Sequence, residues 1–160
     1  MDIAEGIAFY VIGALTIGAA LLVVSLRNIF HAVLALVVAF VGIAGLYITL
    51  NAGFLATVQV LIYAGAIAIL TLFAVFMTRN AMTQGNPPGR LQGPAFVAAL
   101  LMFIAMTYVF VNSAWGAGSG TSFGAAEMAA SLFGPFAFPF ELASVLLLIA
   151  MVGAIVISRE

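Results

Sequence analysis

The chain has 160 residues, of which 66% are hydrophobic and only 6% are charged, and its formal net charge is -1. About a quarter of the residues in a soluble domain are charged, and a chain of this length cannot hide so many apolar residues from water. The composition therefore excludes an ordinary soluble domain and indicates an all-α integral membrane protein. Cysteine is absent, which excludes disulfides, thiolate zinc sites and cysteine-ligated iron–sulfur clusters within this chain.

Five apolar stretches reach, or nearly reach, the roughly 20 residues that a helix needs to cross a hydrocarbon core about 30 Å thick. The acidic N-terminus lacks the basic segment of a signal peptide, so we expect the first stretch to be retained as a span. Tight turns, RNIFH and NAG, join the first three spans as antiparallel neighbours. In one membrane domain over residues 1–160, the predicted spans are 7–26, 32–50, 54–77, 94–112 and 141–158.

Two longer connections follow the third and fourth spans, at 78–93 and 113–140. The first is polar and contains a Pro-Pro-Gly sequence that cannot continue a helix. The second is rich in Gly and Ser and then in Phe, so we expect part of it to lie at the membrane interface.

The basic residues predict how the protein is oriented. All four are arginines, and with five spans they fall on one side of the membrane: Arg27, Arg79, Arg90 and Arg159. By the positive-inside rule this side is cytoplasmic. We therefore expect the N-terminus and the 113–140 loop on the outer, periplasmic side, and the 78–93 loop and the C-terminus in the cytoplasm.

No Asp, Glu, Lys, Arg or His falls in the middle of a predicted span, although proton pathways and ion sites usually need such residues there. We therefore expect no catalytic, cofactor-binding or metal-binding residue in this chain. Three polar residues near span ends, Arg27, His31 and Glu141, are interpreted as interfacial. Glu141 opens the fifth span, where a helix N-terminus favours a carboxylate, and a proton-relay role for His31 is the less favoured alternative.

Most of the third span, the stretch QVLIYAGAIAILTLFAVFM from Gln59 to Met77, has no charge but places Gln59, Tyr63 and Gly65 among apolar residues. Helix packing explains them if Ala64 and Ala68, with Gly65, admit a close neighbour while the polar side chains hydrogen-bond across the contact. Alternatively, a glycine between alanines makes the segment deformable, and the tyrosine lines a hydrated path. Single-turn π-bulges occur at such functional sites, but residue spacing alone does not reveal one.

Three stretches of the chain resemble a known family. They are VQVLIYAGAIAILTLFAVFM, SLRNIFHAVLALVVAF and PFAFPFELASVLLLIAMVGAIVISR. They resemble the third helix, the turn into the second helix and the last helix of subunit J of bacterial NADH-quinone oxidoreductase, respiratory complex I, whose mitochondrial counterpart is NADH dehydrogenase subunit 6. The resemblance runs from end to end and implies a five-helix membrane subunit of an enzyme, without a redox centre and not catalytic by itself.

The resemblance also implies a role in coupling quinone reduction to proton translocation. A π-bulge reported in the third helix of that family would fall around Tyr63, Ala64, Gly65 and Ala66, close to Gln59, and would act as a gate. The implied partners are the lipid of the bacterial inner membrane and subunits A, H, K and the antiporter-like N, M and L, and not nucleic acid. NADH, FMN, iron–sulfur clusters and quinone would be bound by other subunits.

One departure and two alternatives accompany this interpretation. Some members of the family carry an acid near the cytoplasmic end of the third helix, whereas FMTRNAMTQ has none, so proton carriage at that position is not expected. A relative of complex I that uses ferredoxin as donor fits the chain equally well. A membrane subunit of a multi-subunit cation/proton antiporter is the alternative from another class.

Overall fold

The computed structural model describes residues 3–78, 92–113 and 124–159, and all regular structure in these ranges is helical. In chain order the helices are α1 (Ile3–Ser25), α2 (Ile29–Thr49), α3 (Gly53–Val58), η1 (Gln59–Ile67), α4 (Ala68–Met77), α5 (Gln92–Asn112), α6 (Ala125–Phe133) and α7 (Ala137–Ile157). The segments α3, η1 and α4 form one continuous helix, so five helices are long and apolar enough to cross a membrane. Most of the predicted 78–93 loop, including Arg79 and Arg90, lies outside the described residues.

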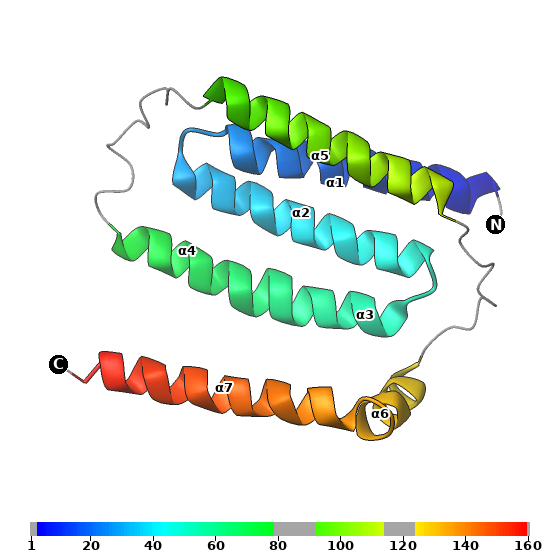
Figure 1. The fold of residues 1–160 in the computed structure, drawn as a ribbon. Coiled ribbons are helices and arrows are strands. Elements are labelled where there is room, and N and C mark those ends of the chain that lie inside the picture. The colour runs from blue at the N-terminus through cyan, green and yellow to red at the C-terminus, as the bar shows by residue number, and fades with distance from the viewer. Residues whose placement is uncertain (1–2, 79–91, 114–123, 160) are drawn as a thin grey trace.

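Three antiparallel helices form a single layer, with α2 between α1 and the continuous α3–η1–α4 helix (Figure 1). Small residues lie where the helices meet. The buried residues are Thr16 and Ala19 of α1, Val33, Ala39, Gly42 and Ala44 of α2, and Ala56, Gln59 and Ala68 of the third helix. Small side chains let helix backbones approach closely, which is how helices pack in membranes without a hydrophobic driving force.

The turn between α2 and α3 has a definite geometry. Asn51 adopts a positive φ of 58°, a left-handed conformation that asparagine tolerates better than most residues. The N–H of Ala52 donates to the carbonyl of Tyr47 at 2.8 Å, and the N–H of Asn51 donates to that of Ile48 at 3.0 Å. These two bonds form a Schellman motif, which ends α2 and reverses the chain within the predicted NAG turn.

All five long helices begin before the spans predicted from hydropathy, which start at residues 7, 32, 54, 94 and 141. α5 begins at Gln92 and α7 at Ala137, so each contains a proline, Pro94 and Pro139, in its first turn. A proline is tolerated there because the first N–H groups of a helix have no partner within the helix. The long 113–140 connection therefore includes α6 and the start of α7.

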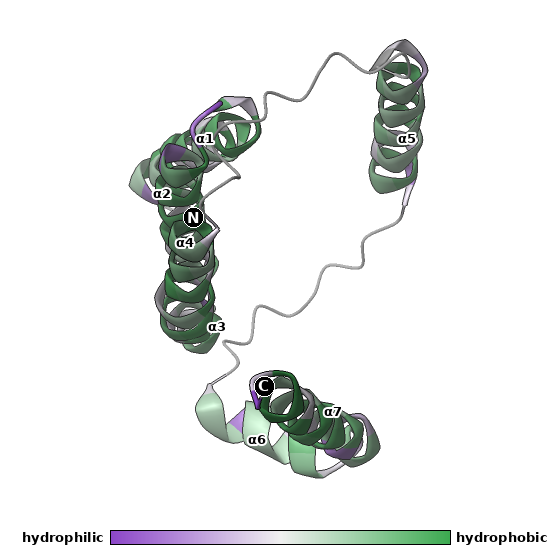
Figure 2. Ribbon diagram, turned by 90° about the vertical axis from the view of Figure 1, so that its left-hand side faces the viewer, coloured by the Kyte–Doolittle hydropathy of each residue, from purple (hydrophilic) through white to green (hydrophobic). Residues whose placement is uncertain are grey.

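The helices α5 and α7 stand apart from the three-helix layer (Figure 2). Every residue from Gly93 to Asn112 is exposed, and α7 has no buried residue. Figure 2 shows both helices as hydrophobic over most of their length. Apolar helices of this kind are stable only in an apolar medium, that is, in lipid or against other membrane helices.

Candidate functional site

The third long helix contains nine residues of π-helix, Gln59–Ile67. The N–H of Ala68 donates to the carbonyl of Tyr63, five residues back, which is the π-helical spacing. Backbone angles at the flanking residues are α-helical, with φ −61° and ψ −42° at Val58 and φ −65° and ψ −39° at Ala68, so the helix continues without a break. The segment includes Tyr63–Ala66, where the family resemblance located a bulge.

Gly65 lies in the middle of the π-helix, where the backbone leaves little room for a side chain. A Cβ on this residue would lie 3.3 Å from the carbonyl oxygen of Val60, five residues earlier. Such a contact is tighter than most that real Cβ atoms make, so Gly65 relieves a local crowding that the π turn creates. Ala64 and Ala66, which flank Gly65, carry only a methyl group, the smallest side chain apart from the hydrogen of glycine.

Threonine hydroxyls bond back to the helix on either side of the π-helix. Thr57 Oγ1 donates to the carbonyl of Gly53 at 3.0 Å, and Thr71 Oγ1 donates to that of Ile67 at 2.8 Å. Threonines that bond to the carbonyl four residues back slightly weaken and often bend a helix. Both hydroxyls therefore loosen the α-helical turns that adjoin the π-helix.

The helix η1 faces α2, and this contact holds the two polar side chains differently. Gln59 is 6% exposed, whereas Tyr63 is 44% exposed and places its ring edge-on against Phe40 of α2, with centroids 5.6 Å apart. No described residue hydrogen-bonds the amide of Gln59, and this amide is not sealed from the surface. The amide is therefore available to a group from outside the chain.

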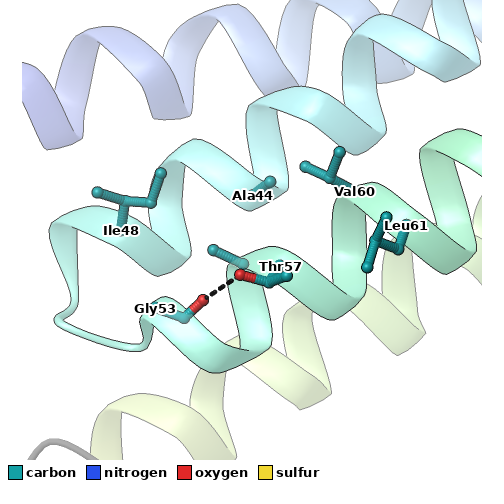
Figure 3. A pocket seen from close by; sticks show the side chains of 7 residues that line it. Ala44, Ile48, Gly53, Thr57, Val60 and Leu61 are labelled. Carbon is teal, nitrogen blue, oxygen red and sulfur yellow. Dashed lines mark hydrogen bonds between the residues drawn. The ribbon is translucent and has the colours of Figure 1, made fainter. Parts of the chain in front are cut away.

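A shallow groove of about 350 Å³ adjoins the first turn of the π-helix (Figure 3). It is lined by Ala44 and Ile48 of α2 and by Gly53, Ala56, Thr57, Val60 and Leu61 of the third helix. The only side-chain hydroxyl in this lining, that of Thr57, already donates to Gly53. The groove offers apolar contact and no acid, base or nucleophile, so it can accommodate a hydrocarbon group but perform no chemistry.

The three residues predicted to be interfacial do not meet one another or the π-helix. Arg27 is exposed in the connection between α1 and α2, and His31 is exposed in the first turn of α2, with its ring edge-on to Phe30. The expectation that Glu141 opens the last helix is wrong, because α7 begins at Ala137 and has no acid in its first turn. Glu141 instead lies one turn inside, exposed, and its carbonyl accepts the hydroxyl of Ser144 at 2.7 Å.

Phe40 was not singled out from the sequence, yet it is the aromatic partner of Tyr63. The sequence contains information that would have predicted this contact, because Phe40 and Tyr63 lie equally far along the chain from the turn at Asn51 and Ala52. In an antiparallel pair of helices, residues equidistant from the turn lie at the same level. In the described part of the chain, no three His, Cys, Asp or Glu side chains gather as metal ligands would.

Comparison with known proteins identifies the family. The family described as NADH-ubiquinone/plastoquinone oxidoreductase chain 6 matches residues 19–157. The chain is 39% identical to NAD(P)H-quinone oxidoreductase chain 6 of Synechocystis sp. over 169 residues, covering 100% of this chain and 85% of that protein. It is 33% identical over 159 residues to NADH-quinone oxidoreductase subunit J of Escherichia coli, covering 96% and 86%.

A relative with another electron donor in its name is equally similar. The F(420)H(2) dehydrogenase subunit J of Methanosarcina mazei is 35% identical over 165 residues, covering 97% of this chain and 91% of that protein. The five apolar helices agree with a multi-pass membrane protein. The chain belongs to the NADH-ubiquinone/plastoquinone oxidoreductase chain 6 family, which includes subunit J of respiratory complex I.

Proposed function

We propose that this chain couples quinone reduction to proton translocation in the membrane arm of an NADH:quinone oxidoreductase, through reversible rewinding of η1. The observation that carries the proposal is the π-helix Gln59–Ile67 in the middle of an uncharged span. π-helices are rare in proteins, and those that occur are often found at functional sites. The chain acts as a gate and contributes neither a redox centre nor a proton-carrying acid.

Rewinding would change which groups face the neighbouring helices. Closing the π turn into an α turn removes one residue from it, and each residue of an α-helix turns about 100°. The two halves of the third helix would therefore rotate against each other by roughly this angle. Since the Tyr63 ring packs on Phe40 of α2 and Gln59 is buried in the helix that packs on α2, this rotation would move both polar side chains relative to α2. A change of this size can make or break a chain of water molecules.

The assembly around the gate follows from the same proposal. The chain lies in a bacterial inner membrane, with its N-terminus on the periplasmic side and its C-terminus in the cytoplasm. This orientation agrees with the positions of the four arginines in the sequence. Subunits A, H and K and the antiporter-like N, M and L surround the chain and supply the buried acids. NADH, FMN, iron–sulfur clusters and quinone are bound by those or other subunits.

The names of the relatives support a role independent of the donor. They include an NADH, an NAD(P)H and an F(420)H(2) enzyme, and each covers nearly all of this chain. A chain shared by enzymes named for three donors would act downstream of the point where electrons enter. This common step is the one that links quinone chemistry to the membrane arm.

Substitution of Gly65 by valine tests the proposal. Its Cβ would meet the Val60 carbonyl in the π form, so the variant should favour the α form and lose proton pumping and quinone-coupled turnover. Electron transfer from the donor to an artificial acceptor should stay normal. Gly18→Val is the matched control, because Gly18 lies in α1 with no atom near its Cβ position. Full coupled turnover by a normally assembled Gly65→Val complex would refute the gate.

A further inference from the structure

The short helix α6 is amphipathic and is separate from the five long helices. With about 100° of turn per residue, Met128, Leu132, Ala129 and Phe133 share one face, and Glu127 and Ser131 share the other. At about 100° per residue the four apolar residues span roughly 140° of the helix circumference and the two polar residues only about 40°, so the apolar face is the wider one. This pattern is typical of a helix that lies along a boundary between water and an apolar medium.

The rest of the chain covers little of the apolar face of α6. Phe133 is 70% exposed, and Met128 is half-buried. The ring of Phe133 meets that of Phe140 in α7 edge-on, with centroids 5.1 Å apart. Next to this pair, Phe136 and Phe138 are also exposed. These exposed apolar residues of α6, of the connection and of the first turn of α7 are here called the α6 aromatic surface: Leu132, Phe133, Phe136 and Phe138.

A tight connection fixes α6 to the beginning of α7. The N–H of Phe136 donates to the carbonyl of Ser131 at 3.1 Å, and the N–H of Ala137 donates to that of Gly134 at 3.2 Å. A Cβ on Gly134 would lie 2.8 Å from the carbonyl oxygen of Ala130, so only glycine fits this turn without a shift. Both views show α6 crossing the beginning of α7 instead of continuing its axis (Figures 1 and 2).

The length of α7 sets the depth of α6. A helix of 21 residues is about 31 Å long, close to the roughly 30 Å of a hydrocarbon core. The first turn of α7 therefore lies at the edge of the hydrocarbon. Phe140 belongs to this first turn, so the ring of Phe133, which touches it, lies at the same depth. A helix that crosses α7 here runs along the bilayer surface, with its aromatic rings at the level where acyl chains meet headgroups.

The charges around α6 indicate how it would hold lipid. No Lys or Arg occurs between Arg90 and Arg159, so α6 and the segments that flank it carry no cation of their own to attract anionic headgroups. The one carboxylate of α6 turns back toward the helix N-terminus, since Glu127 Oε2 lies 2.8 Å from the Cβ position of Gly124. Attraction to lipid would therefore come from apolar burial and be insensitive to headgroup charge.

We propose that α6 lies in the bilayer interface at the N-terminal end of α7, with the α6 aromatic surface inserted among lipid acyl chains. The helix anchors the beginning of α7 at a fixed depth through the contact between Phe133 and Phe140. The ligand is the lipid of one leaflet, of any headgroup charge, and not a protein partner.

Photocrosslinking in the assembled complex tests this proposal. The photoreactive amino acid p-benzoylphenylalanine is placed at Phe133, at Ala129 on the same face, or at Glu127 on the polar face as the matched control. After irradiation of native membranes, mass spectrometry of the purified chain should show lipid adducts several-fold more often at the first two positions than at the third. Adducts with another polypeptide at Phe133 and Ala129, equal lipid yields at all three positions, or no adduct at all would each overturn the proposal.

A second measurement guards against a photoreactive variant that fails to assemble. Because the chain has no cysteine, a single introduced thiol reports its own position. Glu127→Cys should react quickly with a membrane-impermeant maleimide, while Phe133→Cys and Ala129→Cys should react at least several-fold more slowly. Equally fast reactivity at the three positions would place the whole of α6 in water, and equally slow reactivity would bury its polar face as well; either result would refute its position at the interface.

Discussion

Gly42 of α2 is a position where an added methyl group should cost stability, because α1 passes directly against it. A Cβ at this position would overlap Oγ1 of Thr16 and lie 3.1 Å from its Cβ and 3.4 Å from its Cα. The hydroxyl is held in place, since Oγ1 donates to the carbonyl of Ile12 at 2.7 Å. In Gly42→Ala, either Thr16 turns away and loses this bond or the two helices move apart.

The size of the effect follows from these two routes. Overpacking a fitted contact costs about 1–3 kcal/mol, and losing one hydrogen bond costs about 1 kcal/mol. Rotation of Thr16 would still leave its Cβ too close to the Cβ added at position 42, so both costs apply in part. We therefore expect Gly42→Ala to lower the stability by about 2 kcal/mol. The assembled complex, heated in detergent and analysed on native gels, should dissociate at a clearly lower temperature than wild type.

Two further variants isolate the cause of this loss. Thr16→Gly combined with Gly42→Ala removes the overlapping atoms and leaves only the 3.4 Å contact with Cα, so part of the stability should return; the rest stays lost because the double variant lacks the Thr16 hydrogen bond and has a glycine inside α1. Gly18→Ala in α1 adds the same methyl group where no atom lies nearby, and should be neutral or slightly stabilising because alanine favours helix. The reasoning is refuted if Gly42→Ala dissociates at the wild-type temperature, or if the double variant is no more stable than the single one.

Three other substitutions test the site and its support. Tyr63→Phe keeps the ring contact with Phe40 and removes the hydroxyl, so the complex should assemble normally and lose part of its coupled turnover, measured as proton uptake per quinone reduced; an unchanged ratio would assign Tyr63 to packing alone. Gln59→Leu removes an amide to which no described residue hydrogen-bonds, so the thermal stability of the complex should not fall. Coupled turnover should fall several-fold. Destabilisation with normal turnover would contradict the role of the amide. Asn28→Ala removes the N-cap of α2, whose side chain accepts a hydrogen bond from the N–H of Phe30 at 3.0 Å. The loss should lower the stability by about 1 kcal/mol. It should be seen as a lower dissociation temperature, with normal turnover per assembled complex.

Much of the fold could be predicted from residues alone, because membrane helices follow from long apolar runs. The turn between α2 and α3 was also readable, since Asn51 suits the left-handed conformation that it adopts. The start of α7 was not, because the fifth span was predicted to open at Glu141, whereas the helix already begins at Ala137 and its first turn accepts Pro139 without losing a hydrogen bond. Hydropathy measures how apolar a segment is and does not register where its first turn begins.

The π-helix could not be predicted from composition or spacing. The π and α forms of Gln59–Ile67 contain the same residues and differ by a shift of one residue in the hydrogen-bonding pattern. The free-energy difference between the π and α forms depends on crowding around Gly65 and on contact with α2, which a single sequence does not describe. The resemblance to the family implied a bulge around Tyr63–Ala66, which lies within η1. The aromatic contact of Tyr63 with Phe40, in contrast, follows from the symmetry of the hairpin.

The arrangement of the layer explains why a change in η1 would be felt by neighbours. The helix η1 packs against α2 on one side, while Leu61 and Ile62 on its other sides are exposed. Rewinding therefore has to rearrange one internal interface, where Gln59 and the Tyr63 ring lie, and no second layer within the described chain resists it. The exposed side would transmit the rotation to whatever helices or lipid lie against it. The proposed gate would in this way control a proton path that neighbouring subunits provide, because it would change their surroundings and carry no proton itself.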